Sequence, residues 1–352
     1  MTIFGESAGG MSVHAHVLSP WNYGQIQGAI AQSGTMLYYK GLKTSGEERF
    51  AKHAAQDIFD CKQAATELDQ SVLECLQSIE AETLSDKLSL DIDEYFNLSS
   101  ATPWDWHPVI DTYAENPFLP MDPLEAMKTG TFNRIPFMSG TVKNEGALMV
   151  GVFSSQGQRD TLEEYWSIYG PPLILSDSSR EKFSTEEVLL SNISHRYYNH
   201  PEGDTAVEKD QPLMDLLSDA TFLSPDQKTV ELMSEYSQYI FNYYMTQQTD
   251  HSFLAKLFNQ SKAYTPVHAD DLIFLMPLYG NKPDFSAEES ALSEHMVKYW
   301  TNFAKFGHPS PSAQGDLPFW APVSQDHKVI QPTYCIINVD FVSGIYGTEG
   351  LA

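Results

Sequence analysis

The ten residues Met1–Gly10 read M-T-I-F-G-E-S-A-G-G, and they decide how the rest of the chain is interpreted. Residues 2–4 are β-branched or aromatic, which is typical of a buried strand. The pentapeptide Gly5–Gly9 follows, and G-x-S-x-G between a strand and a helix indicates a tight turn that exposes a serine hydroxyl. This stretch therefore predicts a strand, a sharp turn at Ser7 and a helix.

The residue types around Ser7 suit a nucleophile on such a turn. Gly5 and Gly9 lack the Cβ atoms that we expect to collide where strand and helix cross. The backbone N–H of Ala8 is predicted to point to where a substrate oxyanion forms. The alternative is an ordinary Gly-Ser turn that opens a helix, but the strand-like run before it and the small-residue segment 8–18 behind it favour the nucleophile turn.

Several further stretches carry a resemblance to a known family. They are Ala29–Gly34 (A-I-A-Q-S-G), Pro108–Asp111 with Phe118–Pro120, Ile135–Gly146 (I-P-F-M-S-G-T-V-K-N-E-G), Val267–Leu272 (V-H-A-D-D-L), and Tyr299–Lys305 with Gly307 and Pro309. With G-E-S-A-G-G they resemble the type-B carboxylesterase and cholinesterase family of α/β-hydrolases. The turn at His268 resembles that of arthropod-type esterases. The resemblance covers about residues 1–340.

The resemblance implies an α/β fold of the α/β-hydrolase type. We expect the C-terminal portion of its mostly parallel central sheet, with helices on both faces, in one catalytic domain over residues 1–340. A helical cap insertion is expected at about residues 150–235, and residues 341–352 are expected to form a frayed tail.

The sequence also predicts that the chain lacks an N-terminal part of this fold. The nucleophile strand should lie mid-sheet, yet almost nothing precedes it, and no H-G-G-G-like loop that would supply further oxyanion donors occurs. We therefore expect a fragment of a longer esterase that is inactive by itself.

The catalytic set implied by the resemblance is Ser7 as nucleophile, Glu145 as acid and His268 as general base. Their order along the chain is that of α/β-hydrolases. Two alternatives for the acid are Asp111 and Asp270, and two histidines that also lie in predicted turns are His107 and His308. With an ordinary histidine pKa, acylation should rise with pH through roughly 6–7.

Four further side chains are candidates for supporting roles. The family uses a serine at the position of Ser33 to fix the acid, although an ordinary turn serine is the alternative. Glu6 is interpreted as a structural acid beside the nucleophile. Trp104 and Trp106 lie where acyl-pocket residues fall in the family, and core or rim aromatics are an equal alternative.

The sequence contains no motif for a metal or an organic cofactor. It has no H-E-x-x-H, no cysteine pair at zinc spacing and no glycine-rich phosphate loop. Asp270 and Asp271 are interpreted as negative charge at the N-terminus of a helix after the histidine turn. We expect no cofactor and no metal.

Three cysteines and three sequons bear on the cellular compartment. The resemblance implies a disulfide between Cys61 and Cys75, with two buried thiols as the alternative, while Cys335 is expected to be a buried free thiol. The glycosylation sequons begin at Asn97, Asn192 and Asn259. Together they favour a secreted protein or one in the lumen of the secretory pathway.

Composition excludes several partners. The chain has 47 acidic and 21 basic residues, a formal net charge of −26, which disfavours nucleic acids and anionic membranes. No run of eighteen apolar residues is present, so no membrane-spanning segment is expected.

The function implied by the resemblance is hydrolysis of a small-molecule carboxylic ester through an acyl-enzyme. A choline-ester hydrolase is a narrower alternative, since an acidic surface attracts cations. A non-catalytic adhesion or interaction domain is the alternative from another class. The oligomeric state is not predicted.

Overall fold

The computed structural model describes most of the chain. The described residues are 1–38, 51–61, 69–88, 108–112, 114–174, 205–277, 283–311, 317–323 and 335–337.

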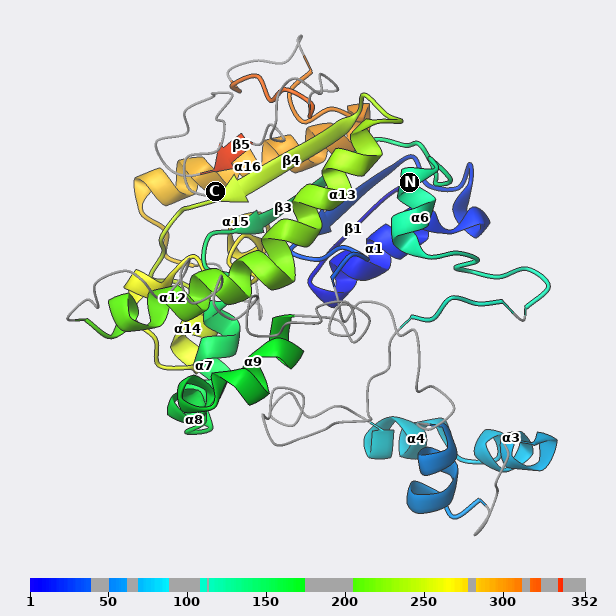
Figure 1. The fold of residues 1–352 in the computed structure, drawn as a ribbon. Helices are drawn as coiled ribbons and strands as arrows, with labels where there is room; N and C mark the ends of the chain where they lie inside the picture. Colours follow the sequence, from blue (N-terminus) through cyan, green and yellow to red (C-terminus); the bar gives the residue numbers. More distant parts are fainter. Residues whose placement is uncertain are drawn as a thin grey trace.

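A parallel sheet of five strands organises the described residues (Figure 1). The strands are β1 (Thr2–Glu6), β2 (Gly28–Gln32), β3 (Phe137–Val142), β4 (Ile240–Met245) and β5 (Cys335–Ile337). They lie side by side in this order, and each pairs in parallel with the next. Every carboxyl end therefore faces the same edge of the sheet, where open α/β sheets bind ligands.

Helices cover both faces of the sheet because both faces are apolar. In β2, for example, Ala29 and Ala31 point to one hydrophobic cluster, whereas Ile30 points to another. The helices that pack on the sheet are α1 (Ala8–Leu18), α6 (Pro123–Lys128), α13 (Ser224–Ser234), α15 (Leu272–Leu275) and α16 (Ala287–Phe306).

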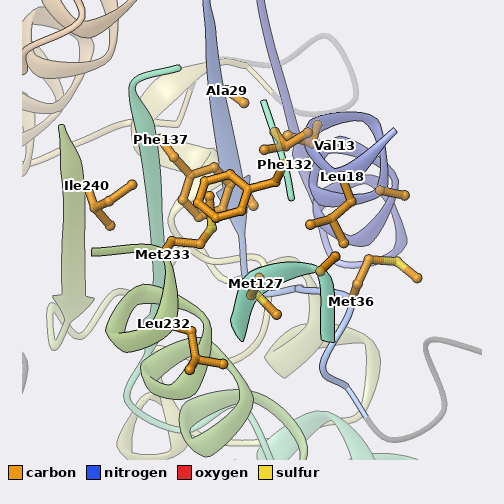
Figure 2. Packing of buried hydrophobic residues seen from close by; sticks show 14 of the residues in the cluster. Val13, Leu18, Ala29, Met36, Met127, Phe132, Phe137, Leu232, Met233 and Ile240 are labelled. Carbon is orange, nitrogen blue, oxygen red and sulfur yellow. The ribbon is translucent and has the colours of Figure 1, made fainter. Parts of the chain in front are cut away.

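The first face carries α1, α6 and α13. Figure 2 shows side chains from these helices, among them Val13, Met127 and Met233, packed against Phe137 of β3 and Ile240 of β4. The second face carries α15 and α16. The predicted α/β fold with a parallel sheet and helices on both faces is thus confirmed.

The long helix α16 has clear sequence signals at both of its ends. Ser286 and Glu289 form a capping box at its N-terminus, which satisfies backbone N–H groups that have no partner inside the helix. Gly307 ends the helix in the left-handed conformation, with φ 69°, which costs glycine little.

A second group of helices has its own core. It contains α7 (Ala147–Ser155), α8 (Arg159–Glu164), α9 (Trp166–Ile174), α12 (Ala206–Ser218) and α14 (Phe253–Leu257). Their apolar side chains form one cluster that also includes Val267, the residue before His268. The range in which a cap is expected, about residues 150–235, therefore contains α8, α9, α12 and most of α7 together with α13, which packs on the sheet, whereas α14 lies beyond it.

The remaining helical segments are short. They are η1 (Pro20–Asn22), η2 (Ala54–Ile58), α3 (Gln70–Gln77), α4 (Ala81–Leu88), η3 (Asp219–Leu223) and η4 (Lys262–Tyr264). The predicted disulfide is present and joins Cys61 to Cys75 of α3, while Cys335 is a buried free thiol. Among the helices described, none is both long and apolar enough to cross a bilayer.

Candidate active site

The turns after three neighbouring strands bring the predicted side chains together. Ser7 follows β1, Ser33 follows β2, and Glu145 comes three residues after the end of β3. His268 lies in the turn between η4 and α15, and a bridge between Asn144 and Val267 holds this turn beside the end of β3. All four side chains thus meet at the carboxyl edge of the sheet.

Ser7 occupies the strained turn that its motif predicts. Its φ is 57° and its ψ is −120°, a backbone conformation that costs energy for a residue with a Cβ. The backbone N–H of Ser7 donates to the carbonyl of Gln32 at 2.8 Å, and Met11 N–H donates to the carbonyl of Ser7 at 3.0 Å. These bonds from β2 and α1 hold the turn.

Close approach around the turn depends on three glycines. A Cβ at Gly5 would lie 2.6 Å from the carbonyl oxygen of Gly9, and one at Gly34 would lie 2.2 Å from that of Ser7. A Cβ at Gly10 would lie 2.8 Å from the carbonyl oxygens of β2 and its turn. A Cβ at Gly9 would meet nothing within 4 Å, so the predicted clash at this position is wrong.

A chain of short hydrogen bonds links the serine to the carboxylate. His268 Nε2 lies 2.8 Å from Ser7 Oγ, and His268 Nδ1 lies 2.6 Å from Glu145 Oε2. With Nδ1 protonated toward the carboxylate, Nε2 is the free acceptor for the serine proton. The geometry therefore suits transfer of that proton to the imidazole.

Glu145 is fully buried and is held at its other oxygen. Oε1 accepts from Ser33 Oγ at 2.6 Å and from the backbone N–H of Val142 at 2.9 Å. These two donors leave Oε2 directed at His268, so the carboxylate has one orientation. Ser33 thus contacts Glu145, as the supporting role predicted for it requires.

Glu6 provides a second carboxylate on the nucleophile side of the imidazole. Its Oε1 lies 3.1 Å from His268 Nε2, although it makes no hydrogen bond there. Burial raises the pKa of Glu6 to about 7, against the lowering influence of the nearby His268. Burial lowers the pKa of His268, but Glu6 and Glu145 outweigh it and raise that pKa to about 9.

Asp271 lies at the N-terminus of α15, as predicted, and its side chain is fully buried in a hydrogen-bond network. It makes no side-chain cap at the start of α15. Its Oδ2 accepts from Gln32 Nε2 at 2.8 Å and from Tyr243 Oη at 2.5 Å. Burial raises the pKa of Asp271. Its hydrogen-bond partners on β2 and β4 were not predicted, because neither is visible from local sequence.

An aromatic wall adjoins the imidazole. The ring of Phe222 in η3 lies 4.7 Å from that of His268, centre to centre, and the ring of Tyr38 stacks on that of Phe222 at 5.9 Å. Neither residue is a sequence candidate. No local pattern marks Phe222, which is 46 positions from the histidine it covers.

The alternative acids and bases lie elsewhere or bond differently. Asp111 accepts from the backbone N–H of Ala114, and Asp270 from that of Val267. His308 Nδ1 accepts from the N–H of Ser310. The described alternatives are thus engaged away from Ser7.

Some predicted residues lie outside the described part of the chain. They are Trp104, Trp106, His107, Asn97 and Asn192. Asn259 is described and is exposed in a turn after α14. Over the described residues, no group of three or more His, Cys, Asp or Glu side chains is arranged to hold a metal ion.

A parallel sheet with helices on both faces, a serine on a strand-to-helix turn and a histidine-carboxylate pair beside it define an α/β-hydrolase. The sequence model described as the carboxylesterase family matches residues 1–336. The chain therefore belongs to the carboxylesterase family.

Three relatives illustrate this membership. Juvenile hormone esterase of Tribolium castaneum is 30% identical over 88% of this chain and 54% of its own length. Carboxylesterase 1D of Rattus norvegicus is 29% identical over 92% of this chain and 54% of its own length. Bile salt-activated lipase of Bos taurus is 27% identical over 92% of this chain and 51% of its own length. The chain thus spans about half the length of the curated relatives it matches.

Proposed function

We propose that this chain carries the catalytic triad of a carboxylic ester hydrolase that works through an acyl-enzyme. The observation that supports this most is the unbroken hydrogen-bond chain from Ser7 through His268 to Glu145. Family membership supports ester hydrolysis in general, whereas the triad and the intermediate are inferred from the chemistry of the side chains.

In the proposed acylation, Ser7 Oγ attacks the ester carbonyl carbon while its proton passes to His268 Nε2. The carbonyl π-electrons move onto oxygen, and the tetrahedral intermediate then expels the alkoxide, which takes the proton from the imidazolium. Glu145 stays ionised and stabilises the imidazolium through Nδ1. In deacylation, water attacks the acyl carbon while His268 takes its proton, and the second tetrahedral intermediate then expels Ser7 Oγ, which takes the proton back, so that the free acid is released.

Developing negative charge needs donors, and the start of α1 offers them. Ala8 is exposed and is the first residue of α1, where backbone N–H groups have no partner within the helix. The helix dipole also favours an anion at this end. We therefore propose Ala8 N–H as one oxyanion donor.

The finer proposals concern the setting of the reaction. A disulfide such as Cys61–Cys75 persists in oxidising compartments, which supports secretion or residence in the secretory pathway. The exposed Asn259 is the described candidate for glycosylation. A small-molecule ester is the proposed substrate.

A fluorophosphonate probe tests the assignment, because it modifies an activated serine. The protein expressed from its complete coding sequence should react, and peptide mapping should place the adduct on Ser7. Ser7→Ala should abolish both labelling and hydrolysis, whereas Ser12→Ala, a serine one turn further along α1, should change neither. An adduct on another serine, or undiminished turnover by Ser7→Ala, overturns the proposal.

A further inference from the structure

A buried carboxylate on α12, that of Asp210, forms an ion pair with the partly exposed Arg159 of α8. Asp210 of α12 is 8% exposed, and its Oδ1 accepts from Arg159 Nε of α8 at 2.5 Å. Its Oδ2 accepts from Tyr264 Oη at 2.6 Å. Both oxygens of the carboxylate are therefore engaged, one by a cation and one by a hydroxyl.

Tyr264 belongs to the segment that carries the histidine. It closes η4, four residues before His268, and is 7% exposed. Its hydroxyl is fixed on α12, so the start of the segment is tied to a helix rather than left to the turn itself. The position of the imidazole depends on where Tyr264 is held, because only a short stretch of backbone separates Tyr264 from His268.

The backbone of Tyr264 is tied to the acid as well. Its carbonyl oxygen accepts from Asn144 Nδ2 at 2.8 Å, and Asn144 N–H donates to the carbonyl of Pro266 at 3.1 Å. Asn144 immediately precedes Glu145. One tyrosine thus connects the histidine turn, the glutamate turn and α12.

We propose that Tyr264 and Asp210 are positioning residues that set the distance between His268 and Glu145. Arg159 holds the Asp210 carboxylate in place. The inference rests on the proposed function, since it assigns the network to the same histidine-carboxylate pair. None of the three side chains contacts Ser7 in the structure, so their action is through the turn.

Tyr264→Phe isolates the hydroxyl, because it keeps the ring and the backbone carbonyl that Asn144 uses. We expect kcat to fall about tenfold or more, since small displacements of catalytic groups cost up to about 10²-fold, and KM to stay within about twofold. The factor should be the same for esters with different acyl and alcohol groups, because no substrate pocket is altered.

The pH profile separates positioning from a general loss of stability. The carboxylates that face His268 are Glu6, Glu145 and Asp271, and they support its protonated form. If the imidazole moves away from Glu145, the acid limb of kcat/KM should move to lower pH in Tyr264→Phe. A purely structural weakening leaves the midpoint of that limb unchanged.

Tyr236→Phe is the matched control. It also removes a tyrosine hydroxyl that donates at 2.6 Å, in this case to the carbonyl of Lys128 on the first face of the sheet. Its kcat and pH profile should be those of the unmodified protein. Asp210→Ala combined with Tyr264→Phe should cost less than the product of the two single effects, because each single change already breaks the hydrogen bond between Tyr264 and Asp210.

The outcomes distinguish this inference from the proposed function. Loss of hydrolysis in Ser7→Ala together with an unchanged kcat and pH profile in Tyr264→Phe overturns the positioning role alone. Retained hydrolysis in Ser7→Ala overturns the function on which it rests. A drop in kcat that Tyr236→Phe reproduces also refutes the positioning role.

Discussion

Glu145 contributes its negative charge to the proposed mechanism and takes up no proton in it. Three donors surround it, Ser33 Oγ, Val142 N–H and His268 Nδ1. Glu145→Gln keeps the shape but replaces the charge by an amide that cannot support an imidazolium. We expect kcat to fall by about 10⁴, the size of effect known for a serine-protease triad acid, with little change in the melting temperature.

Ser33→Ala is the graded comparison for that variant. It removes one of the donors that orient Glu145 but leaves the carboxylate and the backbone donor in place. Its kcat should lie between those of the unmodified protein and Glu145→Gln. A Ser33→Ala variant as slow as Glu145→Gln would contradict the order of importance assigned here.

The pH profile should reflect the carboxylate at Glu6. A histidine pKa raised to about 9 favours the imidazolium, which cannot accept the Ser7 proton, so a higher pH is needed for activity. We expect the acid limb of kcat/KM to be centred above pH 7, higher than the ordinary histidine pKa suggests. In Glu6→Gln the limb should move back toward 6.5, the ordinary value. Identical limbs in both proteins would show that Glu6 has no influence.

Single residues could be predicted from the sequence where they belong to a recognisable short motif. Ser7, Glu145 and His268 each follow a short pattern, and the structure brings them within hydrogen-bond distance. Phe222 and Asp271 escaped because their significance comes from partners on other elements. A single sequence carries no local sign of such distant contacts.

The close approach of the turn after β2 to the Ser7 turn shows how backbone packing between elements shapes the site. Gly34→Ala would put a Cβ 2.2 Å from the carbonyl oxygen of Ser7, an approach that forces backbone to shift. We expect loss of most activity and a clear drop in melting temperature. Gly9→Ala meets nothing within 4 Å and should not lower the melting temperature, since alanine favours a helix by about 1 kcal/mol.

The interface of α13 with the sheet contains a buried acid. Asp226 is 4% exposed, and its Oδ2 accepts from Asn242 Nδ2 of β4 at 2.6 Å. Burial raises its pKa to about 6 from the ordinary 3.8. Between those values the folded protein holds a proton that the unfolded chain has released, so stability falls as pH rises and stays lower above pH 6.

Asp226→Asn should remove this penalty, since an amide oxygen still accepts from Asn242. Its gain in the free energy of unfolding over the unmodified protein should grow by up to about 3 kcal/mol from pH 4 to pH 8. Denaturant titrations at the two pH values measure this. Asp160→Asn, which removes a charge from an exposed side chain, is the control and should show a much smaller change. A gain for Asp226→Asn that shrinks with pH would contradict the sign.

Elements with strong signals were predicted, and those shaped by packing were not. A capping box and a terminal glycine mark the two ends of α16 in the sequence, and β3 is a short apolar run. The π-helical turn η3, which places Phe222 over the histidine, lies between α12 and α13 without a break in helical character. Nothing local distinguishes it from the helices around it.

The whole molecule is a strongly acidic α/β protein with a formal net charge of −26. This charge does not determine the fold, but it affects how the protein associates with other molecules. Its class was predictable because parallel strands and helices alternate along the chain. Which helices pack on the sheet and which belong to the cap is harder to predict from the sequence. Residues of α13 pack on the sheet, whereas α12 just before it belongs to the second helical cluster.

The exposed edge of β1 leads to the last prediction. Among the described residues β1 pairs only with β2, and Phe4 in the middle of the strand is 54% exposed. Unpaired strand edges template association with other chains, and an uncovered apolar face adds to it. We expect residues 1–352, expressed alone, to associate and to hydrolyse a nitrophenyl ester poorly.

The same assay on the protein from its complete coding sequence is the reference, with light scattering to follow association. Phe4→Lys, which places a charge on the exposed side chain, should reduce association of the 352-residue chain, because charged edge residues oppose strand pairing. Leu257→Lys is the matched control, since Leu257 is 60% exposed at the end of α14, in the second group of helices. A monomeric 352-residue chain with turnover equal to the reference contradicts this prediction, as does equal rescue by both lysine variants.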